Sequence, residues 1–245
     1  MQKSKPTLAS IVFAASLAFV PLVSAQQATR NAAAQNAMPA ETEVLTYNVE
    51  HPTYGNIGTY TNTVTQIGNT TDVRTDLHIA VKVIGIRMFH QDATREERWN
   101  NHQLVSFKST TDDNGTQIGV TGKADGNAFH INSTADGVLT APPQVHPSNP
   151  WAPFVLQTDT MMSTKSGKVT NVVVRDTGVI TMNFDGKQER VHQWFVDDDK
   201  HQVVWIDDRG VVVAFQTEEQ GSPINFVLRS QTAAAPGSAP ALANN

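Results

Sequence analysis

The sequence predicts a mainly β protein: an antiparallel meander that forms a curved sheet or half-barrel, with a long Pro-rich loop and little helix. Three observations predict this class. Apolar and polar residues alternate with a period of two through most of the chain, as expected of strands that bury one face. Turn-forming pairs such as Asp-Gly separate these runs at short intervals. No run of comparable length repeats its apolar residues with the helical period of 3.6.

The clearest strand covers residues 72–83, where mostly apolar side chains stand at the odd-numbered positions. Beyond it the phase slips, because apolar residues fall on even-numbered positions from Ile84 to Met88. Gly85 lies at the slip. A one-residue change of phase at a glycine predicts a β-bulge or a sharp bend within one long strand.

The other predicted strands are short runs that flank turns. Asp112 to Gly115, which fails the calcium-loop pattern, is interpreted as one such hairpin turn. The predicted strands are residues 43–50, 56–66, 94–99, 103–109, 119–123, 128–132, 178–184, 188–196, 203–206, 211–217 and 224–228.

Two segments interrupt this pattern. Residues 134–153 contain five prolines, which predicts a long, stiff loop. Residues 159–165 are expected to form a helical turn or part of a short helix. The loop divides the strands into two runs, and the sequence leaves open whether these form one sheet or two.

The N-terminus has the features of a secretory signal. Two lysines precede an apolar run over residues 8–23, which ends in small residues. We expect a signal peptide over residues 1–25, cleaved between Ala25 and Gln26, and a periplasmic mature protein. The apolar run is shorter than the roughly 20 residues of a spanning helix, and no later stretch is long enough to span a membrane.

The remaining chain is predicted to hold one folded domain. Residues 26–40 have the composition of a flexible linker, residues 41–230 form a single β domain, and residues 231–245 form a disordered tail. The chain has no cysteine, which excludes disulfides, thiolate metal sites and a cysteine nucleophile.

The net charge of the chain limits the partners that it is expected to bind. Removal of Lys3 and Lys5 with the signal peptide takes the formal charge from −5 to −7, and no Lys/Arg run offsets this locally. Nucleic acid as a partner is therefore excluded, and an anionic membrane surface is disfavoured.

Several segments resemble a known group of proteins. They are Glu97-Arg98-Trp99 with residues 103–107, the Asp112–Gly115 turn, residues 205–212, and an early pattern of Tyr47, Ile57-Gly58 and Val64. Together they are similar to exported bacterial domains of unknown function, over most of residues 43–228. That group resembles curved half-barrels such as periplasmic lipoprotein carriers. The resemblance implies the fold and no catalytic residue.

The sequence assigns no catalytic residue, metal ligand or cofactor. The eight histidines form no HExxH or HxH pair, and zinc needs at least three converging ligands. No GxSxG, SxxK or phosphate-binding loop occurs. Glu97, with Arg95 and Trp99 on the same strand face, is interpreted as a surface ion pair over a tryptophan. Enzymatic activity stays undecided, because a triad assembled in space is recognised by geometry.

The aromatic residues are the candidate ligand-binding residues. Trp99, Phe107, Trp151 and Trp205 fit either ordinary core packing or the lining of an apolar pocket between the sheet and the loop. The first hypothesis is a binding or carrier module for an apolar or lipid-like molecule. The alternatives are a structural or interaction protein of the cell envelope without a small ligand, and a hydrolase with a hidden site.

Overall fold

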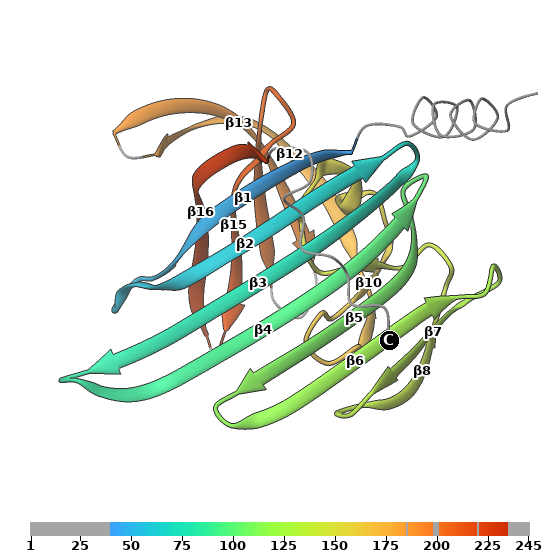
Figure 1. Cartoon of the computed structure of the whole chain (residues 1–245). Helices are drawn as coiled ribbons and strands as arrows, with labels where there is room; N and C mark the ends of the chain where they lie inside the picture. The colour runs from blue at the N-terminus through green and yellow to red at the C-terminus, as the bar shows by residue number, and fades with distance from the viewer. Residues whose placement is uncertain (1–39, 185, 198–200, 220, 235–245) are drawn as a thin grey trace, which may run out of the picture. The chain divides into compact units, whose positions relative to one another are not determined.

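The computed structural model describes residues 40–184, 186–197, 201–219 and 221–234. The predicted signal peptide, its cleavage site, nearly all of the linker and most of the tail lie outside the described residues. Within them, strands build one 13-stranded antiparallel sheet and one three-stranded sheet (Figure 1).

The large sheet contains most of the described residues. Its strands are β1 Glu41–His51, β2 Gly55–Ile67, β3 Thr70–Val83, β4 Ile86–Asn100, β5 Gln103–Asp113, β6 Thr116–Ala124, β7 Phe129–Ser133, β8 Gly137–Ala141, β12 Val173–Phe184, β13 Lys187–Asp197, β14 Gln202–Asp207, β15 Val212–Glu219 and β16 Ser222–Ala234. The small sheet is formed by β9 His146–Pro147, β10 Thr160–Met162 and β11 Val169–Asn171, and the 3-10 helix η1 covers Pro153–Leu156.

The strand order joins the two runs into one sheet. β1 to β8 form one meander and β12 to β16 another, and β16 pairs antiparallel with β1 between them. The strands β8 and β12 form the two edges, so the sheet curves without closing into a barrel. This confirms the predicted fold class and answers the question of one sheet or two.

The phase slip near Gly85 is a chain reversal. Ile84 and Gly85 have φ angles of 51° and 77°, and Val83 pairs with Ile86 across them. Two positive φ angles are typical of the two-residue hairpin turn that matches strand twist. The prediction of a bulge in one long strand is wrong, because isoleucine is not a residue that signals such a turn.

Three other boundaries differ from the prediction. The predicted loop 134–153 contains the strand β8, and residues 159–165 contain the strand β10 where a helical turn was expected. The helical turn lies instead in η1. Residues 231–234, predicted as tail, belong to β16, where Ala234 pairs with Thr42.

The concave face of the large sheet is covered by one continuous stretch, residues 142–172, called the inner segment below (Figure 1). Its side chains belong to both hydrophobic clusters of the core. Leu156, Met161 and Val172 pack with strands from both halves of the sheet, and Val145, Trp151, Val155 and Met162 pack with β3 to β8.

Candidate functional site

The structure brings three of the four predicted ligand-binding residues together. Trp99, Phe107 and Trp151 belong to one buried cluster, with exposed fractions of 1, 3 and 7 %. Trp205 does not join them. It alternates along β14 with the buried Val204 and Ile206, so it lies on the opposite face, where its indole donates to Gln193 Oε1 at 3.0 Å.

A buried carboxylate lies at the centre of this cluster. Glu97, on β4, is 2 % exposed. Its Oε2 accepts hydrogen bonds from Trp99 Nε1 at 2.9 Å and Trp151 Nε1 at 3.1 Å. Its Oε1 accepts one from Asn149 Nδ2 at 2.7 Å. Since Asn149 and Trp151 come from the inner segment, the carboxylate fastens that segment to the sheet.

The hydrogen bonds continue from Asn149 across two further strands. Asn149 Nδ2 also donates to Thr75 Oγ1 on β3 at 3.1 Å, and Thr75 Oγ1 donates to Asn62 Oδ1 on β2 at 2.6 Å. Tyr60, also on β2, donates its hydroxyl proton to Asn149 Oδ1. All four side chains are buried. These four residues, with Glu97, Trp99 and Trp151, are called the Glu97 network.

Burial dominates the electrostatics of this network. It raises the pKa of Glu97, against the opposing effect of the donors on Asn149, Trp99 and Trp151 and of the nearby Arg95 charge. Burial likewise raises the pKa of Tyr60 to about 12. The interpretation of Glu97 as a surface ion pair is therefore wrong. Its strand neighbour Trp99 is a hydrogen-bond donor to it, which period-two spacing alone does not reveal.

The arrangement suits a structural fastening better than a reaction. The three hydrogen bonds already occupy both oxygens of Glu97, and the residues that make them are themselves buried. A general acid or base needs a substrate within hydrogen-bond reach, and the inner segment stands where that substrate would lie.

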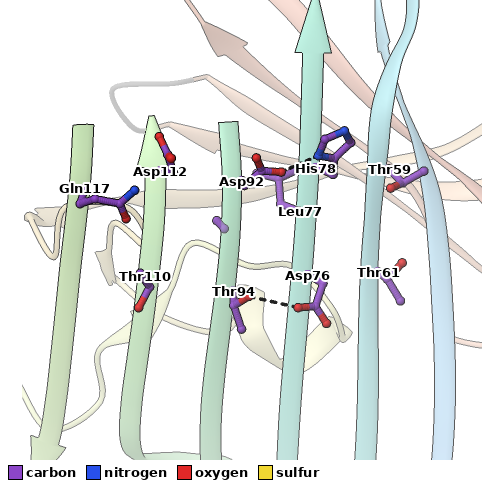
Figure 2. A pocket seen from close by; sticks show the side chains of 11 residues that line it. Thr59, Thr61, Asp76, Leu77, His78, Asp92, Thr94, Thr110, Asp112 and Gln117 are labelled. Carbon is purple, nitrogen blue, oxygen red and sulfur yellow. Dashed lines mark hydrogen bonds and ion pairs between the residues drawn. The ribbon is translucent and has the colours of Figure 1, made fainter. Parts of the chain in front are cut away.

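The outer face of the same strands carries a shallow polar hollow of about 450 Å³ (Figure 2). Figure 2 shows His78 and Asp92 pointing toward each other, and Thr94 toward Asp76. Apart from Leu77 and Ala93 the lining is polar. The lining residues are Thr59, Thr61, Asp76, Leu77, His78, Asp92, Ala93, Thr94, Thr110, Asp112 and Gln117.

The aspartates of this hollow interact with neighbouring side chains of the protein itself. Each aspartate already has a partner: Asp76 accepts from Arg74 at 3.0 Å, Asp92 contacts His78, and Asp112 lies 3.5 Å from His90. Within the described part of the chain, no three His, Cys, Asp or Glu side chains are placed to hold a metal ion.

The fold and the site define a class: open, curved antiparallel β proteins whose concave face is filled by their own chain. The domain of unknown function DUF6134 matches residues 53–229, and the chain belongs to that family. No curated protein matches the sequence. None of the helices in the described residues is long and apolar enough to cross a membrane.

A solved structure shares this fold. The crystal structure of a beta-barrel-like protein of domain of unknown function DUF1849 from Brucella abortus aligns with a TM-score of 0.58. The alignment covers 79 % of this chain and 98 % of that one, at 9 % sequence identity. At that identity the likeness shows the fold alone, in agreement with the predicted half-barrel of an uncharacterised family.

Sequence reasoning missed most of the Glu97 network. One signal was present: Asn62 and Thr75 lie at positions where the strand alternation points inward. Such residues are polar on an apolar face and need a partner there. Their partner Asn149 lies in the Pro-rich loop, and its distance of 74 residues from Thr75 hides the contact from any local pattern.

Proposed function

We propose that this chain is an exported interaction protein of the cell envelope, without catalytic activity, which acts through its outer surface. The single observation that carries the proposal is the filled concave face. The inner segment occupies the place where a carried molecule would lie, and the Glu97 network holds it there.

The energetics of the network support this reading. A guest in the concave face would have to displace Trp151 and Asn149 from Glu97. An apolar guest offers no hydrogen-bond donor, so the carboxylate would remain buried with most of its partners lost. Leaving one buried polar group unsatisfied costs about 1–3 kcal/mol, and a charged group costs more.

The carrier function is the second candidate, and one observation favours it. The strands β9 to β11 pair among themselves and not with the large sheet. Contacts to the sheet run through side chains, such as the bond from Ser109 Oγ to the Thr164 carbonyl at 2.8 Å. The inner segment could therefore move away without breaking the hydrogen bonds of the large sheet. Trp99 on β4 and Phe107 on β5 would then line the vacated space, and Trp151 would move away with the segment.

Native mass spectrometry separates the two candidates. The protein, expressed with its N-terminus and purified from the periplasm without detergent, is exposed to phospholipid and then measured. We expect the mass of the chain alone. A stoichiometric adduct of lipid mass, lost in a folded Trp99→Ala variant, would overturn the interaction proposal in favour of a carrier.

A cross-link tests the same point in a second way. Because the chain has no cysteine, Ser109→Cys with Thr164→Cys creates a single pair that ties the inner segment to β5. We expect no uptake of a fluorescent fatty acid by the oxidised or the reduced form. Uptake that appears only on reduction would establish a carrier, and the single variant Ser109→Cys controls for the added thiol.

Export is a separate part of the proposal. Its support is the lysine-led apolar run that ends at Ala25. Cell fractionation followed by N-terminal sequencing is expected to give a periplasmic chain that begins at Gln26. A cytoplasmic chain that retains residues 1–25 would contradict it.

A further inference from the structure

The hairpin that joins β3 and β4 extends past its neighbours. β2 pairs with β3 only as far as Ile79, opposite Gly58. β5 pairs with β4 only from Gln91 onward, opposite Asp113. Residues 81–89 therefore pair only with each other, and Figure 1 shows their turn lying beyond the ends of β2 and β5. This two-stranded piece is called the projecting ribbon.

The end of the projecting ribbon is apolar and exposed. Ile84 is 97 % exposed, Ile86 65 %, Met88 61 % and Val83 39 %. Scattered single apolar residues on a surface need no explanation, but a contiguous group of this kind indicates an interaction site. Val83 pairs with Ile86 on the face that carries the buried Val81 farther back, so the apolar face of the sheet continues into solvent.

The turn places its most exposed apolar side chain at a conformational cost. Ile84 has a φ of 51°, a left-handed conformation that is disfavoured in particular for β-branched residues. Asparagine or glycine is the usual residue at this position of a two-residue turn. An isoleucine here adds nothing to the turn itself, and its side chain is free to contact a partner.

Two cations lie on the other face of the projecting ribbon. Lys82 and Arg87 are direct cross-strand partners, both exposed. Residues 80–89 contain no acid, and within the described residues neither cation takes part in an ion pair. Like charges directly opposite each other on a sheet repel, and an anion between them would remove that repulsion.

We propose that the projecting ribbon docks on the surface of an anionic phospholipid bilayer. Ile84, Ile86 and their apolar neighbours enter the interface, and Lys82 and Arg87 bind lipid phosphates. Apolar side chains combined with flanking cations are what such a surface recognises. This inference rests on the proposed function, since it names the partner of the outer surface.

The net negative charge of the chain does not oppose this docking. The Debye length is about 8 Å at physiological ionic strength, so a bilayer at the end of the projecting ribbon responds to Lys82 and Arg87 rather than to the total charge. The sequence-based expectation against an anionic membrane used the total charge and the absence of a Lys/Arg run. The fold separates these two cations from the acids elsewhere.

Vesicle flotation tests the proposal. The wild-type protein is expected to float with phosphatidylglycerol-containing vesicles and much less with pure phosphatidylcholine vesicles. Lys82→Gln with Arg87→Gln should lower the partition coefficient about 30-fold, the change that two surface cations supply. Ile84→Ser with Ile86→Ser should lower it at least about tenfold through lost apolar burial.

Matched variants control for charge and exposure. Arg190→Gln with Arg229→Gln removes two exposed cations elsewhere, and Val138→Ser removes an apolar side chain that is 82 % exposed on β8. Both should bind as the wild type does. Circular dichroism melts check that every variant folds.

Three outcomes would overturn the proposal. The wild type does not float with anionic vesicles, or the ribbon variants float as it does, or the protein is a dimer in solution that Ile84→Ser with Ile86→Ser dissociates. The last result would assign the ribbon to a contact between copies.

A fluorescent label places the contact on the ribbon. The emission maximum of a fluorophore on Ile84→Cys should shift to the blue on vesicle addition, and that of a fluorophore on Val138→Cys should not.

These outcomes are independent of the test of the proposed function. A lipid adduct that is lost in Trp99→Ala and kept in Ile84→Ser with Ile86→Ser does not come from the projecting ribbon. It would refute the filled interior and leave flotation unchanged. Failure to float would refute the bilayer partner and leave the mass unchanged.

Discussion

The two ends of the β3–β4 hairpin carry the same apolar alternation and have opposite surroundings. At one end Val73, Trp99 and their neighbours lie beneath the inner segment, and every polar group of Glu97 has a partner. At the other end Ile84 and Ile86 stand in solvent. The alternation identifies the apolar face, and what covers that face depends on a distant segment.

Each end of the hairpin also contains one residue that is unfavourable in its local surroundings. The buried Glu97 is an unfavourable residue for a core, and the network compensates it with three donors. Ile84 is an unfavourable residue for its turn, and nothing in the described residues compensates it. An uncompensated exception is the better indication of function.

The largest expected effect tests the covered end. Glu97→Ala leaves two buried indole N–H groups and an amide without their acceptor, so we expect a loss of about 3–5 kcal/mol in the free energy of unfolding. Urea denaturation measures it. Glu96→Ala on the outer face, where Glu96 pairs with the partly exposed Arg74 at 3.3 Å, should cost at most about 1 kcal/mol. Equal losses would contradict the role of the network.

A second variant tests the border between the two ends. Gly58 is the residue of β2 that pairs with β3 nearest to the projecting ribbon. A Cβ on Gly58 would lie 1.9 Å from the carbonyl oxygen of His78. Gly58→Ala should therefore lower stability by about 1–3 kcal/mol, measured by thermal unfolding. For Gly119→Ala the nearest atom is 3.7 Å away, and the loss should be clearly smaller. The reverse order would show that β2 shifts freely against β3.

The pH dependence of stability sharpens the description of the covered end. Because the pKa of Glu97 is raised in the folded protein, the folded state binds the proton more tightly than the unfolded state. Its contribution to the free energy of unfolding should fall as the pH rises from about 4.5 to the folded-state pKa, with a slope of up to about 1.4 kcal/mol per pH unit.

The variant Glu97→Gln isolates that contribution. It has no proton to bind, so its urea-unfolding profile across this range should lack the slope. Identical profiles for the variant and the wild type would mean that Glu97 keeps its ordinary pKa.

The smallest expected effect tests the exposed end. Ile84→Asn relieves the left-handed conformation, so the free energy of unfolding should rise by about 0.5–1 kcal/mol, while vesicle binding falls. Val138→Asn, at an exposed residue without a positive φ, should bring no gain in the same melts. A destabilised Ile84→Asn would show that the isoleucine contributes to the fold.

Much of the fold was predictable because its signals are local. The turns at Asn114-Gly115 and Asp125-Gly126 contain residues that tolerate their backbone angles, so the strands beside them were found. Ile84-Gly85 carried no such signal, and a hairpin was interpreted as a bulge. The strands β8 and β9 were missed because they fall in the Pro-rich stretch 134–153, which was interpreted as one loop. The strands β10 and β11 were missed because each is three residues long.

The candidate site was predictable only in part. Trp99, Phe107 and Trp151 stood out as aromatics on inward positions or in the loop. Nothing in the sequence tied Trp151 and Asn149 to Glu97, which lies more than 50 residues away. The carboxylate could be recognised as buried only once the loop was placed over it.

The sequence by itself determined the class of fold, the inward face of most strands, the hairpin turns with glycine or asparagine, and the absence of any disulfide. These follow from side-chain alternation and backbone propensity, which act over a few residues. Tertiary structure alone decided that β16 joins β1, that residues 142–172 fill the concave face, and that residues 82–88 project into solvent. Each of these is a contact, or the lack of one, between segments far apart in the chain, where local physics carries no information.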